Sequence, residues 1–184
     1  MDRFWLLTST TYGTWLPGDR RGFVGRVRDA MGATVIHNLP GTPCDEDFPG
    51  RVQAARDVMK GPPIYLRLEH AAVLLAQFQE TARYRSWQLL AVAIMANHVH
   101  WVVGIPGDPD PDRVRGDFKS YGSRVLNRQC GKPPSVTWWT DRGSSRMLKD
   151  PQAVVDGVIY VRDQPNPLLV WLSPEAQALA SGGR

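Results

Sequence analysis

Two apolar runs separated by only two residues constrain the fold of this chain more than any other feature. Residues 89–95 (LLAVAIM) and 98–103 (HVHWVV) are rich in aliphatic and aromatic side chains, as buried strands are. Only Ala96 and Asn97 join them, and so short a connection is typical of an antiparallel hairpin. We therefore expect an antiparallel sheet with this hairpin deep inside it.

Strand-like and helical patterns alternate around this hairpin. Residues 4–12 read as a strand, and residues 69–85 and 112–128 have helical spacing of apolar positions. A third helix is expected to start at Pro151, with Asp150 as its N-cap, and to end at Pro165. A further hairpin is predicted from residues 138–140 and 146–148. This order of elements predicts an α+β sandwich, with helices packed on an antiparallel sheet.

Two segments depart from this regular pattern. Residues 13–63 carry many Gly and Pro and are predicted as a long irregular insertion, with a small hairpin near residues 33–37 and a short helix at residues 50–59. Residues 173–184 are predicted as a flexible tail, so residues 1–172 form the single expected domain. No apolar run reaches the ~18 residues of a membrane span, and the N-terminus lacks a signal-peptide pattern. A cytoplasmic protein without a membrane partner is expected.

Basic residues are concentrated in one part of the chain. The net charge is +4, and residues 113–149 hold nine Lys and Arg against two acids. Such a surplus suggests either a polyanionic partner or a solvated basic surface. In the helix at 112–128, Arg115 and Lys119 are expected to point away from an apolar core stripe, which is formed by Val114, Phe118, Tyr121 and Val125.

Two histidines stand at alternate positions of the second run. His98 and His100 point to the same face of a strand, because side chains alternate along it. Two neighbouring imidazoles are a good half of a metal site, or they simply face solvent or pack on a helix. Their apolar surroundings make unpaired imidazoles costly there.

The helix from Pro151 carries a tyrosine that its own core stripe does not explain. Its valines fall on one side, whereas Tyr160 and Gln164 lie one turn apart on the opposite side, with Asp156 one turn earlier. Tyr160 is therefore either a functional residue or an ordinary surface tyrosine.

These motifs resemble a known family. Residues 95–100 (MANHVH) resemble the His-hydrophobic-His motif of single-tyrosine HUH transposases of the insertion-sequence 200-like superfamily, and residues 160–164 (YVRDQ) resemble its Tyr-x-x-x-Gln signature. Their order and separation match too. Residues 11–19 (TYGTWLPGD) and 138–140 (WWT) are similar to the REP-associated tyrosine transposase branch. The resemblance covers about residues 1–12 and 64–170 and implies a ferredoxin-like sandwich. Ala96 stands where the family usually has proline.

The resemblance also implies roles. His98, His100 and Gln164 would hold one Mg²⁺ or Mn²⁺, and Tyr160 would attack single-stranded DNA next to a hairpin to form a 5′-phosphotyrosine link. Asp156 and Asp163 are nearby acids, but neither is assigned as the general base. A homodimer is among the assemblies that this family allows. Trp15 and Trp101 are either base-stacking or core residues, and the candidates for backbone contacts are Arg124, Arg128, Lys132, Arg142 and Arg146.

Two other functions stay open on the sequence. One is a domesticated, catalytically silent nucleic-acid-binding protein with the same fold. The other is a zinc-dependent hydrolase built on His98 and His100, which needs a further ligand, and His37 and His70 are the candidates.

Overall fold

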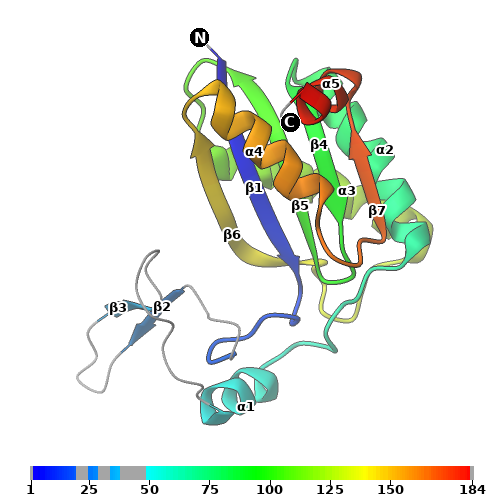
Figure 1. The fold of residues 1–184 in the computed structure, drawn as a ribbon. Coiled ribbons are helices and arrows are strands. Elements are labelled where there is room, and N and C mark those ends of the chain that lie inside the picture. Colours follow the sequence, from blue (N-terminus) through cyan, green and yellow to red (C-terminus); the bar gives the residue numbers. More distant parts are fainter. Residues whose placement is uncertain (1, 20–24, 29–33, 38–48, 183–184) are drawn as a thin grey trace.

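Five strands form one antiparallel sheet in the computed structural model of the chain, which describes residues 2–19, 25–28, 34–37 and 49–182. The strand order is β6-β1-β5-β4-β7, and every neighbouring pair is antiparallel (Figure 1). The strands are β1 (Asp2–Thr11), β4 (Gln88–Ile94), β5 (His98–Pro106), β6 (Trp139–Leu148) and β7 (Leu169–Leu172).

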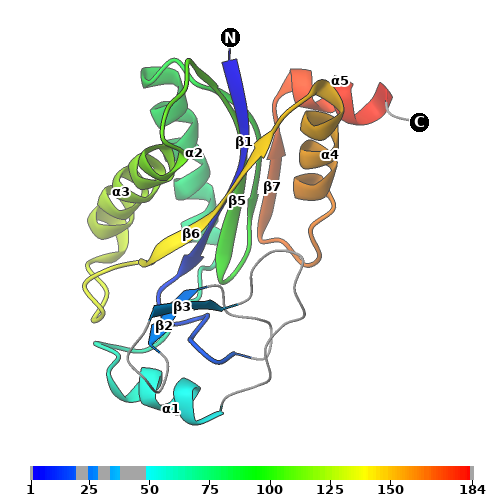
Figure 2. The same cartoon turned by 90° about the vertical axis from the view of Figure 1, so that its left-hand side faces the viewer.

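Four helices cover the two faces of this sheet. Helices α2 (Leu68–Tyr84) and α3 (Pro111–Cys130) lie on one face, and α4 (Pro151–Arg162) and α5 (Pro174–Gly182) lie on the other (Figure 2). The succession β1-α2-β4-β5-α3-β6, with β1 and β5 in the middle of the four strands, is the ferredoxin-like arrangement. The predicted fold class is therefore confirmed. Within the described ranges, no helix combines the length and apolarity needed to cross a membrane.

The central strand β5 is buried on both sides, which explains its unbroken apolar sequence. Trp101 points toward α2 and α3, where its ring stacks on that of Phe118 at 5.4 Å between centroids. Val102 points the other way, into a second cluster with Val158 of α4. Since Trp101 is fully buried, it is a core residue and has no face for a base.

Helix α3 uses a different core stripe from the predicted one. The buried apolar positions are Val114, Phe118, Gly122 and Leu126, whereas Tyr121 is only half-buried and carries the Arg124 guanidinium 4.9 Å from its ring centroid. The prediction of Tyr121 as core was therefore wrong.

The expected hairpin between residues 138 and 148 is also wrong. These residues form β6, a single ten-residue strand at the edge of the sheet that pairs with β1 from Leu148–Phe4 to Trp139–Thr11. Its middle, residues 141–145 (DRGSS), has little strand propensity of its own. Pairing with β1, which is distant in sequence, decides its conformation.

The C-terminal segment holds regular structure that the sequence did not reveal. Residues 173–184, expected as a flexible tail, contain α5, whose first turn is capped when the Ala176 amide donates to Ser173 Oγ at 3.1 Å. Ala176 is completely buried against the α4 side of the sheet. Apolar contact with the sheet stabilises a segment whose Ala and Gly content alone suggested mobility.

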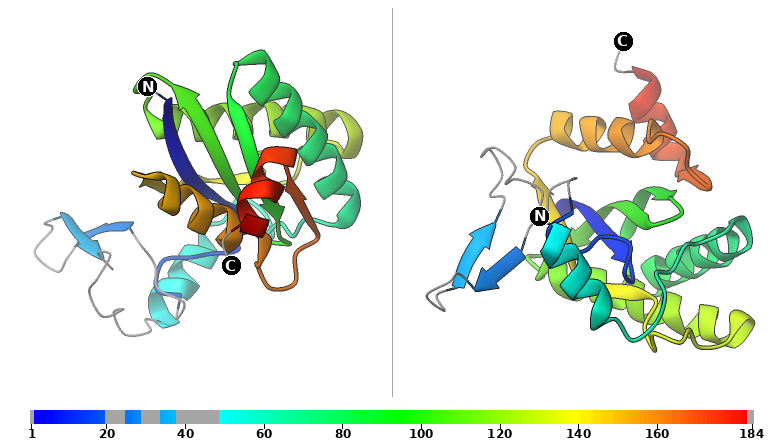
Figure 3. Two further views of the ribbon diagram at one scale, coloured as in Figure 1. Left: turned by 45° about the horizontal axis from the view of Figure 1, so that its top comes forward. Right: turned by 90° about the horizontal axis from the view of Figure 1, so that it is seen from below.

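The described part of the insertion contains three short elements. They are the paired strands β2 (Gly25–Arg28) and β3 (Thr34–His37) and helix α1 (Pro49–Asp57), close to where a hairpin and a helix were expected. They project beyond one end of the main sheet (Figure 3). The two ends of the insertion meet, because the Ile64 amide donates to the Tyr12 carbonyl at 2.9 Å and the Thr11 hydroxyl lies 2.6 Å from the Ile64 carbonyl.

Candidate active site

His98 and His100 share the face of β5 that α4 covers. Their ring centroids are 4.7 Å apart. In the register of β1 with β5, Thr8 lies opposite His100 and Thr10 lies opposite His98. The alternation predicted from the sequence thus places two imidazoles side by side on a central strand.

Each imidazole has an oxygen partner at Nδ1. The Asn97 carboxamide oxygen lies 2.7 Å from His98 Nδ1, and Thr8 Oγ1 lies 2.8 Å from His100 Nδ1. A carboxamide oxygen only accepts, so His98 Nδ1 carries the proton and its lone pair is on Nε2. Burial, reinforced by the charge of His98, lowers the pKa of His100 to about 3, which keeps its ring neutral at pH 7.

The turn before His98 is held by the segment that leaves β1. The Thr11 amide donates to the Asn97 carbonyl at 2.8 Å, and the Thr14 hydroxyl lies 3.2 Å from the same oxygen. Both threonines are buried. Part of the TYGTWLPGD motif therefore fixes the residue that orients His98. Sequence reasoning missed Thr8 and Asn97, although the position of Asn97 directly before the histidines was a usable signal.

Tyr160 lies in the last turn of α4, against His100 of the same chain. Its ring centroid is 5.3 Å from that of His100, in edge-to-face contact, and the side chain is 49% exposed. Gly157, one turn earlier, lets α4 lie close to β6, since a Cβ there would stand 3.1 Å from Leu148 Cδ1. A solvent-accessible phenol and a buried imidazole, 60 positions apart in sequence, thus meet without a second chain.

Gln164 lies just beyond the end of α4. Its Nε2 donates to the Tyr160 carbonyl at 3.0 Å, which satisfies one of the open carbonyls at the helix end and leaves the amide oxygen as the atom suited to a cation. The contact that the structure gives Gln164 is thus with the backbone of Tyr160 and not with the imidazoles.

The two acids near Tyr160 have different surroundings. Asp163 is ion-paired with Arg162, and this hydrogen bond lowers its pKa, so it stays ionised. Asp156 accepts from Gln152 at 2.9 Å and lines a cleft beside Tyr160. Neither has a contact with the phenol that would assign it as the base.

The predicted DNA contacts whose side chains the structure describes do not all lie beside Tyr160. Arg124 and Arg128 are exposed on α3, on the opposite face of the sheet, and Lys132 is exposed just after α3. The side chain of Arg142 lies outside the described part. Arg146, on β6, lines the cleft that also contains Tyr160.

The position of His70 bears on the zinc-dependent hydrolase, for which it was a candidate further ligand. It is buried at the start of α2, where its Nδ1 accepts from the Arg67 amide at 3.1 Å and its ring meets Trp138. The side chain of His37 is outside the described part. Over the residues that are described, no group of three His, Cys, Asp or Glu side chains is placed to hold a metal. The zinc reading therefore lacks its further ligand there.

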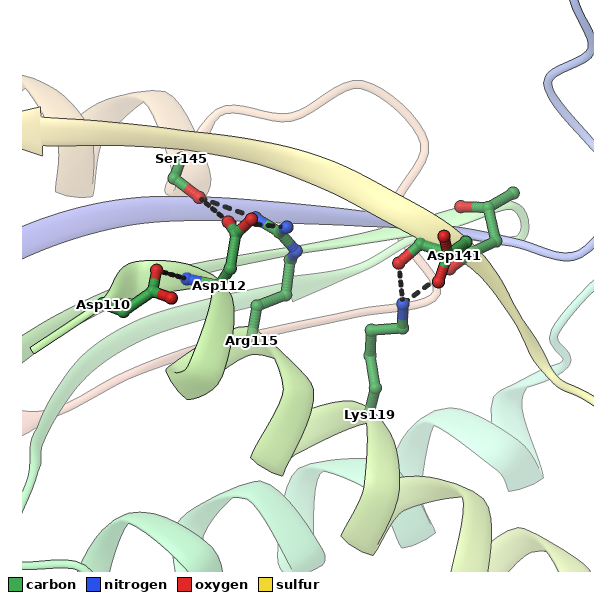
Figure 4. A network of polar contacts seen from close by, with 7 residues as sticks. Asp110, Asp112, Arg115, Lys119, Asp141 and Ser145 are labelled. Carbon is green, nitrogen blue, oxygen red and sulfur yellow. Dashed lines mark hydrogen bonds and ion pairs between the residues drawn. The ribbon is translucent and has the colours of Figure 1, made fainter. Parts of the chain in front are cut away.

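A polar network on the α3 side holds the edge strand β6 in place (Figure 4). The Arg115 guanidinium donates to Ser145 Oγ at 2.6 Å and to Asp112 Oδ1 at 2.8 Å, and it is almost completely buried. Lys119 Nζ donates to the carbonyls of Thr140 and Asp141, where the β1–β6 register shifts. Arg115 and Lys119 thus anchor β6. The prediction that they point away from the core was wrong.

A comparison with protein families bears on this site. Residues 64–146 match the family model described as "Transposase IS200 like". The predicted relationship to the IS200-like transposases is confirmed over this segment. The matched segment of this transposase family contains both histidines of β5 and ends before α4, so Tyr160 and Gln164 lie outside it.

Two solved structures are similar to the chain. One is a REP-associated tyrosine transposase bound to a REP hairpin, with 13% identity, a TM-score of 0.42 and coverage of 90% of this chain and 75% of that one. The other is a candidate transposase from Deinococcus radiodurans R1, with 15% identity, a TM-score of 0.44 and coverage of 90% and 92%. Because both TM-scores are below 0.5, the fold is assigned from the strand order of this chain and not from these two structures. No curated protein matches it.

The buried, neutral His100 predicts an acid-sensitive fold. Its pKa of about 3 lies below the ordinary 6.5, so the unfolded chain binds a proton that the folded chain does not, and stability falls as the pH drops from 6.5 toward 3. The slope from this group approaches about 1.4 kcal/mol per pH unit. Urea denaturation in EDTA at a series of pH values should show that the free energy of unfolding falls less steeply with decreasing pH in His100→Gln than in wild type. Parallel profiles would contradict this origin.

Proposed function

We propose that this IS200-like chain cleaves and rejoins single-stranded DNA through a covalent bond between Tyr160 and a 5′-phosphate. The contact between the Tyr160 and His100 rings within one chain is the observation that carries the proposal. A phenol beside a histidine pair is placed to attack a phosphodiester, and a divalent cation, when bound there, would supply Lewis acidity. The family match of the histidine-bearing segment supports the same reading.

The reaction exchanges one phosphodiester for another. The phenolic oxygen of Tyr160 bonds to the scissile phosphorus, the phenolic proton passes to water, and the bond from phosphorus to the 3′-oxygen breaks. The departing 3′-oxygen takes up a proton and becomes a free hydroxyl. Attack by the 3′-hydroxyl of another strand reverses the sequence and releases Tyr160. Because the phosphotyrosine retains the phosphoester bond energy, joining needs no ATP.

The residues at the site fit a divalent cation. His98, His100 and Gln164 would hold Mg²⁺ or Mn²⁺, which when bound supplies Lewis acidity and orients the phosphate. Asn97 fixes His98 with its lone pair on Nε2, and the same tautomer at His100 has Nδ1–H donating to Thr8. The Gln164 amide nitrogen is occupied by the Tyr160 carbonyl, which leaves an oxygen, a ligand that Mg²⁺ and Mn²⁺ favour.

Trapping of the covalent adduct tests this function. A pool of DNA hairpins with randomised single-stranded flanks, labelled at the 3′ end, is incubated with the protein and Mn²⁺. We expect a labelled band that survives denaturing electrophoresis, is absent in EDTA, and does not form when the same pool is labelled at the 5′ end. If hairpins bind without any adduct, the silent nucleic-acid-binding protein is favoured. DNA hydrolysis that depends on zinc retained by the purified protein would favour the zinc-dependent hydrolase.

The hydroxyl of Thr8 is expected to tune cation affinity. Thr8→Val removes the partner of His100 Nδ1 at nearly constant volume, whereas Thr8→Ser keeps a hydroxyl. We expect Mn²⁺ binding, measured by electron paramagnetic resonance, to weaken about tenfold in Thr8→Val. Thr8→Ser should stay close to wild type. Equal affinities for all three proteins would show that Thr8 does not support the ligand.

A further inference from the structure

An open cleft of about 500 Å³ lies directly beside Tyr160. It lies between α4 on one side and strands β1 and β6 on the other, on the same face of the sheet as the histidines. Tyr160 forms part of its wall, so whatever occupies this cleft lies next to the group that Tyr160 attacks. Its volume is in the range of sites that enclose a small ligand.

Part of the cleft lining is apolar, although Thr8 and Ser144 add hydroxyl groups. Leu6 of β1 and Leu148 of β6 line it, and Gly157 contributes no side chain. Leu148 also packs into the core cluster beneath α4, which holds this surface in place. Aliphatic carbon against a position without a side chain suits the flat face of a heterocycle better than it suits a charged phosphate.

Two opposite charges face the cleft from different elements. Arg146 on β6 lines it, and no hydrogen bond or ion pair engages its guanidinium among the described residues. Asp156 on α4 lines it too, and one of its carboxylate oxygens accepts from Gln152. A phosphodiester is attracted by Arg146 and repelled by Asp156. The occupant that fits both must offer acceptors to the arginine and donors to the carboxylate.

We propose that this cleft binds one unpaired guanine of the substrate strand, next to the phosphate that Tyr160 attacks; this inference rests on the proposed function. Guanine offers two adjacent donors, N1–H and N2–H, to the Asp156 carboxylate, and two acceptors, O6 and N7, to Arg146. In adenine, cytosine and thymine the corresponding edge pairs a donor with an acceptor, so one carboxylate oxygen would face another acceptor. In this proposal Asp156 selects the nucleobase, and it does not accept the proton of Tyr160.

Binding of four matched oligonucleotides tests the inference. Each is a labelled 15-residue oligothymidylate, one unchanged and three with a single central guanine, adenine or cytosine. Binding is followed by fluorescence anisotropy with the full chain in EDTA, so that no cleavage interferes. We expect the guanine strand to bind about tenfold more tightly than the other three, as one bidentate base contact allows.

Two pairs of variants localise the preference. Asp156→Asn and Arg146→Gln should each bring the guanine preference close to one. The matched controls, Glu80→Gln and Arg83→Gln, remove the same charges from exposed positions on α2, in the opposite layer, and should retain it. Asp156 and Arg146 are exposed, so their variants are expected to fold, which a thermal melt verifies.

The outcomes separate this inference from the function on which it rests. Equal binding of all four strands would overturn the guanine site and leave single-stranded DNA as the substrate. A guanine preference that survives in Asp156→Asn would overturn the role of Asp156. If no strand binds, and adduct formation fails as well, both proposals fall.

Discussion

Tyr160→Phe is expected to abolish formation of the covalent protein–DNA adduct. The substitution removes only the phenolic oxygen, and the ring that contacts His100 at 5.3 Å remains. No other nucleophile is proposed at the site, so adduct formation should fall below detection, a loss of at least about a thousandfold. Adduct formation is measured on denaturing gels with 3′-labelled hairpin DNA in Mn²⁺.

Tyr121→Phe is the matched control for this variant. Tyr121 is also half-exposed, but it lies on α3 beneath Arg124, on the other face of the sheet. It should form adduct like wild type, and hairpin binding by Tyr160→Phe should persist in gel-shift assays. An adduct formed by Tyr160→Phe would remove Tyr160 from the mechanism.

Gly143→Ala is expected to destabilise the fold by about 2–3 kcal/mol, because overpacking of this kind forces the backbone to move. Gly143 pairs with Ser9 across β1 and β6, and a Cβ at Gly143 would overlap the Thr8 carbonyl oxygen. It would also come within 2.9 Å of the Arg115 side chain, which Asp112 and Ser145 hold in place. Since Thr8 contacts His100, the displacement reaches the site.

Gly116→Ala provides the comparison for this prediction. Gly116 is an exposed residue away from the ends of α3, and a Cβ there meets no atom within 4 Å. The same substitution should therefore stabilise the protein by about 0.5–1 kcal/mol, through helix propensity alone. Urea denaturation of both variants gives the two free energies. A neutral Gly143→Ala would show that β6 adjusts freely at this position.

Local patterns in the sequence were enough to predict most of the core. The apolar runs of β4 and β5 and the cap of α4, where the Ala153 amide donates to Asp150 at 2.8 Å, were correctly anticipated. In each case the residues that determine the structure are close together in sequence. The shared face of His98 and His100 follows from strand alternation in the same way.

Long-range register could not be predicted in this way. The pairing of Thr8 with His100, and the burial of Arg115 against β6, depend on how segments about 90 and 30 residues apart align. The strand character of β6 has the same origin, since its polar middle has no alternating pattern. Arg146 was anticipated from charge, but its position in the cleft with Asp156 became apparent only from the fold.

The meeting of the two ends of the insertion has a consequence for how this protein can change. Tyr12 binds both the Ile64 amide and, through its hydroxyl, the Lys60 amide, so the chain leaves the sheet and returns to it at one place. Each doubling in the length of such an excursion adds only about 0.6 kcal/mol of closure entropy. Changes in the length of the chain between Tyr12 and Lys60 should therefore cost the fold little closure entropy, because the two ends of the excursion stay joined beside the turn that carries Asn97.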